Sequence, residues 1–252
     1  MNGMIGVEER VGLILTAGEL LLTCGAEMAR VEDTIERMGC AAGFTQVESY
    51  ATPTGLFISL HDPAGRVYTR VKRIREGRND IATIAAVNAL SRAFSAKQMG
   101  VDEVRSALEG LQQDRAPDGL ARQLIGGGGA LAFAVMFGGG WREAVLAGMV
   151  GALVLMVVSR LEGRFPKVLQ AAAGAMVASA VITGISRIWE FNANVTILGA
   201  VMVLAPGMVM TTAIRDLLGG ELVSGLSRSA EALVIAVAIA VGVAVVLSLG
   251  GV

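Results

Sequence analysis

The sequence predicts a membrane protein with an N-terminal cytosolic α+β domain, residues 1–118, followed by a five-helix transmembrane α-helical bundle, residues 119–252. Its charges are unevenly placed, because residues 1–118 hold 13 of the 21 Lys and Arg and 16 of the 22 Asp and Glu. The whole chain is 54% hydrophobic and holds 33 glycines, which is too apolar for an ordinary soluble enzyme. Charged residues beginning at Glu8 also argue against a cleavable signal peptide.

Two amphipathic helices are expected first. The pattern from Val11 to Leu22 places apolar residues on one face, and the next helix carries apolar residues from Met28 to Met38 at alternating steps of three and four. Gly43 is placed to end this second helix. Cys40 lies on it among apolar neighbours, and we expect it to be a small buried core residue.

The period then changes from helical to alternating. Short strands are expected over 45–51, 55–60 and 66–71, with turn residues at 61–65 between the last two. Two further helices are expected over 81–96 and 102–113. Together these elements form a compact α+β domain of about 110 residues, which is large enough for its own core.

A basic patch is expected on the last strand and beyond it. Side chains alternate along a strand, so Arg66, Tyr68, Arg70 and Lys72 share one face. Arg73, Arg75 and Arg78 extend the patch. It is either a solvated sheet face or a contact for anionic lipid head groups or an anionic solute. No nucleic acid partner is expected, because Tyr68 alone could stack on a base.

Five segments lack charge over lengths that span a bilayer, for which about 20 apolar residues are needed. These charge-free segments are residues 123–141, 144–159, 168–186, 191–214 and 232–252. The five spans built on them are expected at about 121–140, 141–160, 167–187, 192–214 and 231–251. The second is short between its charges, but Arg142 and Arg160 can extend from its ends to the interface. Their many glycines allow close helix packing, within the bundle or against another subunit.

The loop charges predict the orientation. With the N-terminus inside, the inner side carries seven cations, at 115, 122, 160, 164, 167, 215 and 228. The outer side carries Arg142 and Arg187, each near an acid. We therefore expect a multi-pass protein of the cell inner membrane, with a cytoplasmic N-terminus and a C-terminus on the periplasmic or outer side.

The fourth span holds the strongest candidate for a substrate or proton pathway. Pro206 and Gly207 predict a broken helix, whose freed backbone groups must face protein or water. Such breaks form binding sites in many transporters. A packing kink is the simpler interpretation. Thr211 and Thr212 add hydroxyl groups one turn later.

Charged and polar residues flank this span. Arg215 can hold a substrate carboxylate, and Asp216 can pair with Arg215 or carry a proton. Alternatively the two merely mark the membrane boundary. A similar boundary cluster before the fifth span contains Arg228 and Glu231, the latter being our second candidate for the proton after Asp216. Asn192 and Asn194 either cap the fourth span or line a vestibule.

Two segments resemble the threonine/serine exporter (ThrE-like) family. They are residues 24–33, CGAEMARVED, and residues 204–228, LAPGMVMTTAIRDLLGGELVSGLSR. The layout is similar to the YjjP subunit of the two-component YjjP/YjjB branch. Two positions differ from the usual family pattern, since Val209 stands where a second Pro is frequent and Thr212 where Asn is usual.

The resemblance implies proton-driven export of small amino acids or dicarboxylates, together with a small YjjB-like membrane subunit and assembly as an oligomer. It also raises five residues of the cytosolic domain as a candidate site: Gly25, Glu27, Arg30, Glu32 and Asp33. Helical spacing offers a simpler interpretation of one pair, because Glu27 and Arg30 at i,i+3 form an ordinary surface ion pair.

Two other functions remain open. A membrane-anchored enzyme could use Glu27, Glu32 and Asp33, although the sequence contains no nucleotide-binding loop, nucleophile elbow or paired-Cys metal site. A sensory or scaffold role is the third interpretation. We expect no catalytic residue, cofactor or metal, and the partners expected are a small-molecule substrate, membrane lipid and the YjjB-like subunit.

Overall fold

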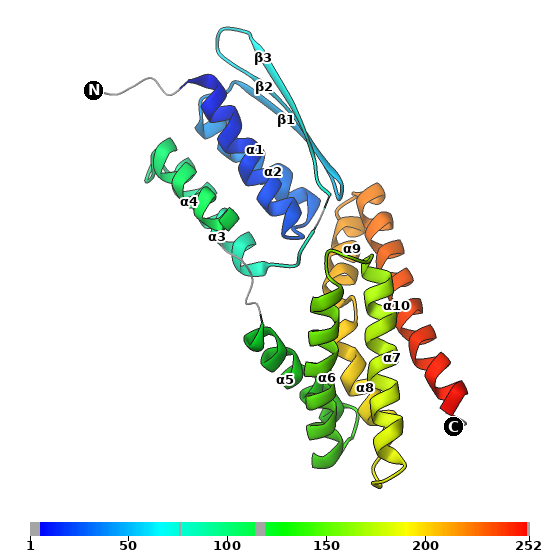
Figure 1. The fold of residues 1–252 in the computed structure, drawn as a ribbon. Coiled ribbons are helices and arrows are strands. Elements are labelled where there is room, and N and C mark those ends of the chain that lie inside the picture. Colours follow the sequence, from blue (N-terminus) through cyan, green and yellow to red (C-terminus); the bar gives the residue numbers. More distant parts are fainter. Residues whose placement is uncertain (1–5, 76, 114–118, 251–252) are drawn as a thin grey trace. The chain divides into compact units, whose positions relative to one another are not determined.

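The computed structural model describes residues 6–75, 77–113 and 119–250, which form two compact units (Figure 1). The N-terminal unit holds the described residues up to 113 together with Met208–Ser229. The helical unit holds residues 119–207 and 230–250. The expected domain boundary at 118, the linker cation Arg115 and the end of the fifth expected span at 251 lie outside the described residues.

Two central helices carry the core of the N-terminal unit. They are α1 (Val7–Thr23) and α2 (Met28–Ala41). The apolar stripe expected on α2 is buried, with Met28, Val31 and Ile35 all fully shielded from water. Cys40, however, is exposed, so the expectation of a buried thiol was wrong. It follows Met38 by two residues, which turns it about 200° away from the buried stripe.

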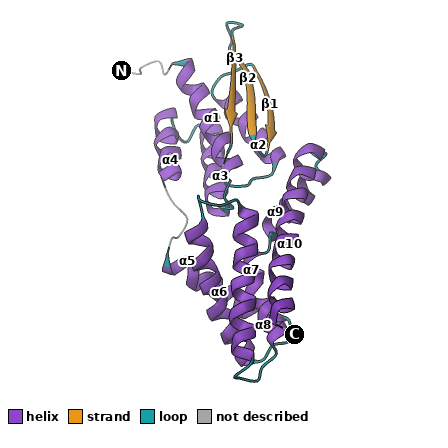
Figure 2. Cartoon of the chain, turned by 45° about the vertical axis from the view of Figure 1, so that its right-hand side comes forward, coloured by secondary structure: helices purple, strands orange, loops and turns teal. Residues whose placement is uncertain are grey.

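An antiparallel sheet packs on one side of these helices, in the order β1-β2-β3 (Figure 2). The strands are β1 (Gln46–Thr52), β2 (Gly55–His61) and β3 (Val67–Arg73), each within two residues of its expected range. On the other side of α1 and α2 lie α3 (Ile81–Ser95) and α4 (Val101–Gln113), as Figure 1 shows.

The expected basic patch on β3 is partly neutralised. Arg70 and Lys72 lie opposite the buried Ile58 and Leu56 of β2, and thus on the sheet face that packs on the helices. Arg70 donates 2.5 Å to the Glu8 carboxylate, and Lys72 Nζ lies 3.0 Å from a Glu19 carboxylate oxygen. These two cations are therefore paired with α1 and do not form an open anionic-ligand surface.

The helical unit is built from apolar helices that contact one another through small residues. Its helices are α5 (Leu120–Met136), α6 (Trp141–Leu161), α7 (Lys167–Ser186), α8 (Ala193–Val201) with the short η1 (Met202–Leu204), and the later part of α10 (Leu222–Gly250). A Cβ atom added to Gly127 would lie 2.8 Å from the Gly148 carbonyl oxygen, and one added to Gly199 would lie 2.7 Å from Ala134 Cβ. Glycine is therefore needed for the approach of α6 and α8 to α5.

Three of the described helices are long and apolar enough to cross a membrane, namely α6, α7 and α10. A fourth is reached if α8 with η1 and the following α9 (Gly207–Leu218) count as one bent span. The apolar helix α5 is 17 residues long and is shorter than these. Five spans thus remain a prediction, while the helices support a membrane protein.

The predicted break in the fourth expected span is present. Helix α8 continues as η1 to Leu204, Ala205 is extended, and α9 starts at Gly207 after a bend of 59°. Pro206 explains the break, because it lacks an N–H and restricts the preceding residue to extended conformations. Beyond the break, Met208–Ser229 belong to the N-terminal unit.

Candidate functional site

Two helix-ending turns form the frame of the site, and both belong to the N-terminal unit. After α1, Gly25 has φ +82° and the Ala26 N–H donates to the Leu21 carbonyl at 2.9 Å. After α9, Gly220 has φ +89° and the Glu221 N–H donates to the Asp216 carbonyl at 2.8 Å. Both are Schellman turns, in which glycine takes the left-handed position. They correspond to the two segments that carry the family resemblance.

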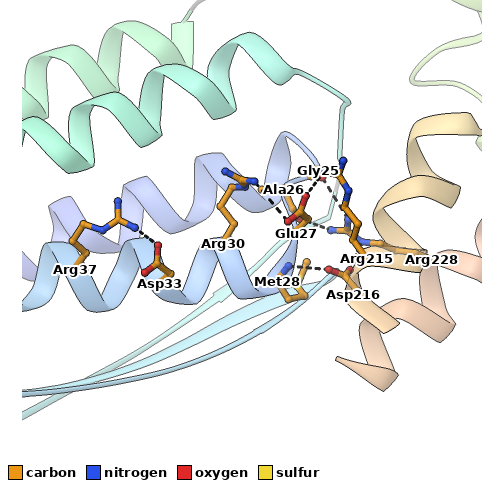
Figure 3. Close-up of polar contacts among 10 residues, drawn as sticks. All are labelled: Gly25, Ala26, Glu27, Met28, Arg30, Asp33, Arg37, Arg215, Asp216 and Arg228. Atoms are coloured by element: carbon orange, nitrogen blue, oxygen red, sulfur yellow. Dashed lines mark hydrogen bonds and ion pairs between the residues drawn. The ribbon is translucent and has the colours of Figure 1, made fainter. Parts of the chain in front are cut away.

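The start of α2 lacks a cap from its own segment. Glu27 occupies the N-cap position and its side chain makes no capping hydrogen bond. Instead the Met28 N–H donates to Asp216 Oδ1 at 3.1 Å, across 188 positions of sequence (Figure 3). A carboxylate at a helix N-terminus satisfies a free N–H group and interacts favourably with the helix dipole. Asp216 on α9 therefore supplies the missing cap of α2.

Arg228, on the first turns of α10, closes the cluster from the other side. Its Nε lies 3.5 Å from Asp216 Oδ2, and its two terminal nitrogens donate to the carbonyls of Gly25, at 3.4 Å, and Ala26, at 2.9 Å. The exposed fractions of the Arg228 and Asp216 side chains are 8% and 1%. A buried ion pair of this kind is stable only when further hydrogen bonds satisfy both partners. Asp216 Oδ2 accepts no hydrogen bond from the described residues, so the ion pair with Arg228 is what balances this oxygen.

A second ion pair joins the same two segments at the surface. Arg215 donates to Glu27 Oε1 at 2.5 Å, and Arg30 lies 3.7 Å from the other oxygen of that carboxylate. The Arg215 side chain is 61% exposed and that of Glu27 is 24% exposed. The i,i+3 pair expected between Glu27 and Arg30 is thus present, as one side of a three-residue cluster (Figure 3).

The remaining two residues of the 24–33 segment point elsewhere. The Glu32 carboxylate accepts a 2.8 Å hydrogen bond from the Ala51 N–H of β1. Burial raises the pKa of Glu32, with the Glu221 charge adding to the shift and the Ala51 hydrogen bond opposing it. Asp33 pairs with Arg37 one turn later on an exposed part of α2. Glu32 therefore ties α2 to the sheet, and Asp33 belongs to the surface.

The loop that follows the sheet also contacts the α1 turn. The Arg78 N–H donates to the Thr23 carbonyl at 2.7 Å and the Asp80 N–H to that of Cys24 at 3.1 Å. Asp80 caps α3 by accepting from the Thr83 N–H at 2.9 Å. Although burial opposes it, hydrogen bonds from Thr83 and the charge of Arg78 lower the pKa of Asp80. These contacts hold the Gly25 turn in place from a second direction.

Other candidate residues lie outside this cluster. Thr212 donates to the Met208 carbonyl of its own helix at 2.9 Å, and Thr211 is exposed on α9. Asn192, Asn194 and Glu231 belong to the helical unit. There Asn192 caps α8 by accepting from the Val195 N–H at 3.3 Å, and Asn194 is exposed.

Glu231 pairs with Lys167 at 3.6 Å in the helical unit, with 45% of its side chain exposed. Asp216 is far more enclosed, with 1% of its side chain exposed. Of the two proton candidates, the structure thus encloses Asp216 and leaves Glu231 at the surface. No group of three or more His, Cys, Asp or Glu within the described ranges has the arrangement of a metal site.

Sequence reasoning missed the Met28 N–H and the carbonyls of Gly25 and Ala26 as partners of Asp216 and Arg228. It also allowed Asp216 to pair with Arg215, whereas the structure pairs Asp216 with Arg228 and Arg215 with Glu27. Adjacent helical residues do not face each other. One signal was available, since Glu27 offers a poor cap to α2 and some other acceptor must serve its N–H groups.

The arrangement is sensitive to a change in the charge of Asp216. It holds a buried carboxylate on a helix N-terminus and a buried guanidinium, beside an exposed guanidinium–carboxylate pair. Loss of the Asp216 charge would remove the counter-charge of Arg228 and weaken the cap of α2 together. The site is therefore suited to respond to a proton or to a competing carboxylate.

Comparisons with known proteins support the family resemblance of the two segments, residues 24–33 and 204–228. The sequence model of the family described as "Putative threonine/serine exporter" matches residues 12–250. A "Probable threonine/serine exporter" of Mycobacterium tuberculosis is 25% identical over 225 residues, which cover 88% of this chain and 42% of that protein. The chain thus spans about two fifths of the length of this curated relative, and no solved structure matches it. With the family model covering nearly all of its length, the chain belongs to the threonine/serine exporter family.

Proposed function

We propose that the chain is a subunit of a proton-coupled secondary exporter for small amino acids, with threonine and serine as the first candidates and dicarboxylates such as succinate as the second. Family membership over residues 12–250 carries this proposal. The long apolar helices α6, α7 and α10 support a place in the membrane. The loop charges favour the inner membrane with the N-terminus in the cytoplasm.

In this proposal the coupling proton binds Asp216. The charged carboxylate caps α2 and balances the buried Arg228. A proton removes that charge and leaves Arg228 enclosed without its counter-ion, which is costly in a buried setting. Protonation therefore favours release of the hairpin formed by α9 and the start of α10 from the turn between α1 and α2.

The exposed pair is the proposed contact for the solute. Arg215 has a fork of donors that matches a carboxylate, and more than half of its side chain is open to water. Its present partner, Glu27, is the group that would receive an ammonium when Arg215 turns to a solute carboxylate. Pro206 and Gly207 provide the broken helix from which Arg215 and Asp216 project.

A second subunit completes the proposal. Transport folds combine two related halves, so we propose assembly with a YjjB-like membrane subunit or with further copies of this chain. Efflux of labelled threonine, serine and succinate should then require both polypeptides. Cells that lack both genes are complemented with either one or with both, and efflux is followed from preloaded cells. Full efflux without the YjjB-like subunit would contradict the two-component arrangement.

Proton coupling is tested with vesicles that contain the assembled exporter and carry an imposed pH gradient. The Asp216→Asn variant should insert normally and lose the dependence of efflux on the gradient. Asp33→Asn is the matched control, because it removes an exposed carboxylate of the other segment. Gradient-driven efflux that is unchanged in Asp216→Asn would exclude Asp216 as the proton site.

A further inference from the structure

An exposed cation lies beside two tryptophan rings at one end of the helical unit. The loop between α5 and α6 and the loop between α7 and α8 meet there, at the lower end of this unit in Figure 1. The Asn192 N–H donates to the Glu143 carboxylate at 2.9 Å, which joins the second loop to the start of α6. Trp141 and Arg142, the first two residues of α6, therefore lie close to Trp189 of that loop.

The two rings hold the guanidinium of Arg142. Its Cζ lies over the Trp141 ring at 5.6 Å from the centroid and over the Trp189 ring at 5.5 Å. Both distances are within the limit of about 6 Å for a cation–π interaction. Phe191 supports the second ring through an edge contact, with the two centroids 6.3 Å apart. The chain thus positions this charge without burying it, since Arg142 is exposed.

The guanidinium has hydrogen-bond donors left for a ligand. A ring face attracts the positive charge, but it provides no oxygen atom for the N–H groups of an arginine. The adjacent acid, Glu143, is directed elsewhere, because its carboxylate accepts from the N–H groups of Asn192 and Gly140. Within the part of the chain that the structure describes, Arg142 forms no ion pair or hydrogen bond. An anion with two oxygen atoms can therefore reach it from outside.

Apolar surface surrounds this charge. Trp141 is 70% exposed, Trp189 is 41% exposed, and the neighbouring Ile188 is 91% exposed. Tryptophan favours the boundary between acyl chains and head groups, because its ring is apolar and carries a polar N–H. Trp141 begins α6 and Trp189 follows the end of α7 by three residues, and both helices are long enough to cross a membrane. This end of the unit is therefore suited to the level of lipid head groups.

We propose that Arg142 and the two tryptophan rings bind a membrane phospholipid through its phosphodiester group. The phosphodiester oxygens accept from two N–H groups of Arg142, in the fork geometry that suits phosphate. The rings of Trp141 and Trp189 contact the glycerol and the first carbons of the acyl chains. The inference requires only that the helical unit lies in the membrane. It does not depend on the solute or the coupling ion of the proposed exporter.

The chain contains only two tryptophans, so its intrinsic tryptophan fluorescence reports on this site alone. The full chain in maltoside micelles is titrated with phosphatidylglycerol that carries bromine on its acyl chains near the glycerol. Bromine quenches an indole ring that it contacts, and the wild type should show saturable quenching. Trp141→Phe and Trp189→Phe each leave one reporter, and both variants should retain saturable quenching because both rings contact the lipid.

Arg142→Gln should weaken this binding at least about tenfold, because the charge-assisted contact with the phosphodiester is lost. Arg187→Gln is the matched control and should bind like the wild type. Arg187 is an exposed cation at the end of α7, but it donates to the Gly250 carbonyl at 3.0 Å. Arg142→Lys keeps the charge without the fork, and its affinity should lie between those of the wild type and Arg142→Gln.

A lipid without phosphate separates recognition of the head group from contact with the rings. Brominated galactosyl diacylglycerol should bind the wild type at least about tenfold more weakly than brominated phosphatidylglycerol. It should bind the wild type and Arg142→Gln about equally, since neither protein has a phosphate to hold. Millimolar inorganic phosphate should not displace the brominated phosphatidylglycerol, because the free anion makes no contact with the rings.

Four results would overturn the proposal. Equal affinity of the wild type and Arg142→Gln for phosphatidylglycerol would remove Arg142 from the site. Equal affinity of the wild type for the two lipids would reduce the cluster to an apolar contact. Displacement by inorganic phosphate would identify a site for a free anion. Absence of quenching in the wild type would mean that protein, and not lipid, covers the rings. Size-exclusion chromatography checks that each variant is folded, and efflux, measured separately, reports on the proposed function alone.

Discussion

Two ion pairs join the same two segments of the N-terminal unit, and they differ chiefly in their exposure to water. In the Asp216–Arg228 pair the side chains are 1% and 8% exposed, whereas in the Glu27–Arg215 pair they are 24% and 61% exposed. Breaking a buried ion pair leaves one charge buried without a counter-charge, whereas in an exposed pair water readily replaces the lost partner. Consecutive residues of α9 therefore serve different ends, with Asp216 holding the segments together and Arg215 available to exchange partners.

The largest effect is expected when Arg228 is removed. Arg228→Met leaves the Asp216 carboxylate buried without a counter-charge, which should destabilise the packing of the α1–α2 turn by about 3–5 kcal/mol. Cys24 reports this opening, because it is fully buried beside Gly25 and burial raises the pKa of its thiol. In a Cys40→Ser background, the alkylation rate of Cys24 should rise more than about 100-fold.

Arg30→Met is the control for that variant. Arg30 also forms an ion pair beside the α1–α2 turn, with Glu27 of its own segment, but its side chain is 38% exposed and the pair is 3.7 Å long. Alkylation of Cys24 in this control should stay within a few fold of wild type. Equal rates in Arg228→Met and Arg30→Met would show that burial does not distinguish the two pairs.

The second prediction separates charge balance from packing. Asp216→Asn combined with Arg228→Met removes both charges, and the amide oxygen of the introduced asparagine side chain can still accept from the Met28 N–H. We expect the double variant to recover at least about 2 kcal/mol of the loss in Arg228→Met, since no charge is then left buried without a counter-charge. A double-mutant cycle on the Cys24 alkylation rate measures this coupling. Additive losses would mean that the two side chains act independently.

Local structure was largely predictable from the sequence, and the site was not. The strands matched within two residues because turn residues and alternation mark their ends. The break at Pro206 followed from the missing proline donor. Cys40 was misassigned because apolar neighbours in sequence were taken for neighbours in space, although the helical period turns it outward.

The contacts of the site depend on pairings across 188 to 203 positions, which no local spacing encodes. Sequence reasoning found Glu27, Arg215, Asp216 and Arg228 as separate candidates, but it could not join them. The number of membrane spans likewise depends on long-range packing. Together with α8 and η1, helix α9 is apolar enough to count as one bent span, yet Met208–Ser229 belong to the N-terminal unit.

A third prediction compares the two glycine turns that frame the pairs. Gly25 and Gly220 both have left-handed backbones, which cost other residues about 1–2 kcal/mol. A Cβ atom at Gly25 would also lie 2.9 Å from Asn79 Oδ1, whereas one at Gly220 meets nothing within 4 Å. Gly25→Ala should therefore destabilise the unit more than Gly220→Ala in thermal unfolding. An equal loss would show that Asn79 moves aside without cost.

A fourth, smaller effect concerns pH at Glu32. Burial raises its pKa in the folded chain, so the folded state binds its proton more tightly than the unfolded state. The stability that this proton provides is present at low pH and is lost as the pH rises through the raised pKa. Glu32→Gln resembles the protonated form, and should match wild type near pH 4 and exceed it near pH 7 in thermal unfolding. Asp33→Asn, on the exposed side of α2, should show no such crossover.

The smallest effect on stability is expected at the exposed pair. Glu27→Gln and Arg215→Gln should each cost at most about 1 kcal/mol, because water replaces the lost partner. The difference from wild type should vanish in about 1 M salt, where the Debye length is about 3 Å. If Arg215 meets the solute, the same Arg215→Gln variant should nevertheless impair efflux strongly. A small loss of stability with a large loss of transport would assign the exposed pair to solute contact, and parallel losses of the two would assign it to structure.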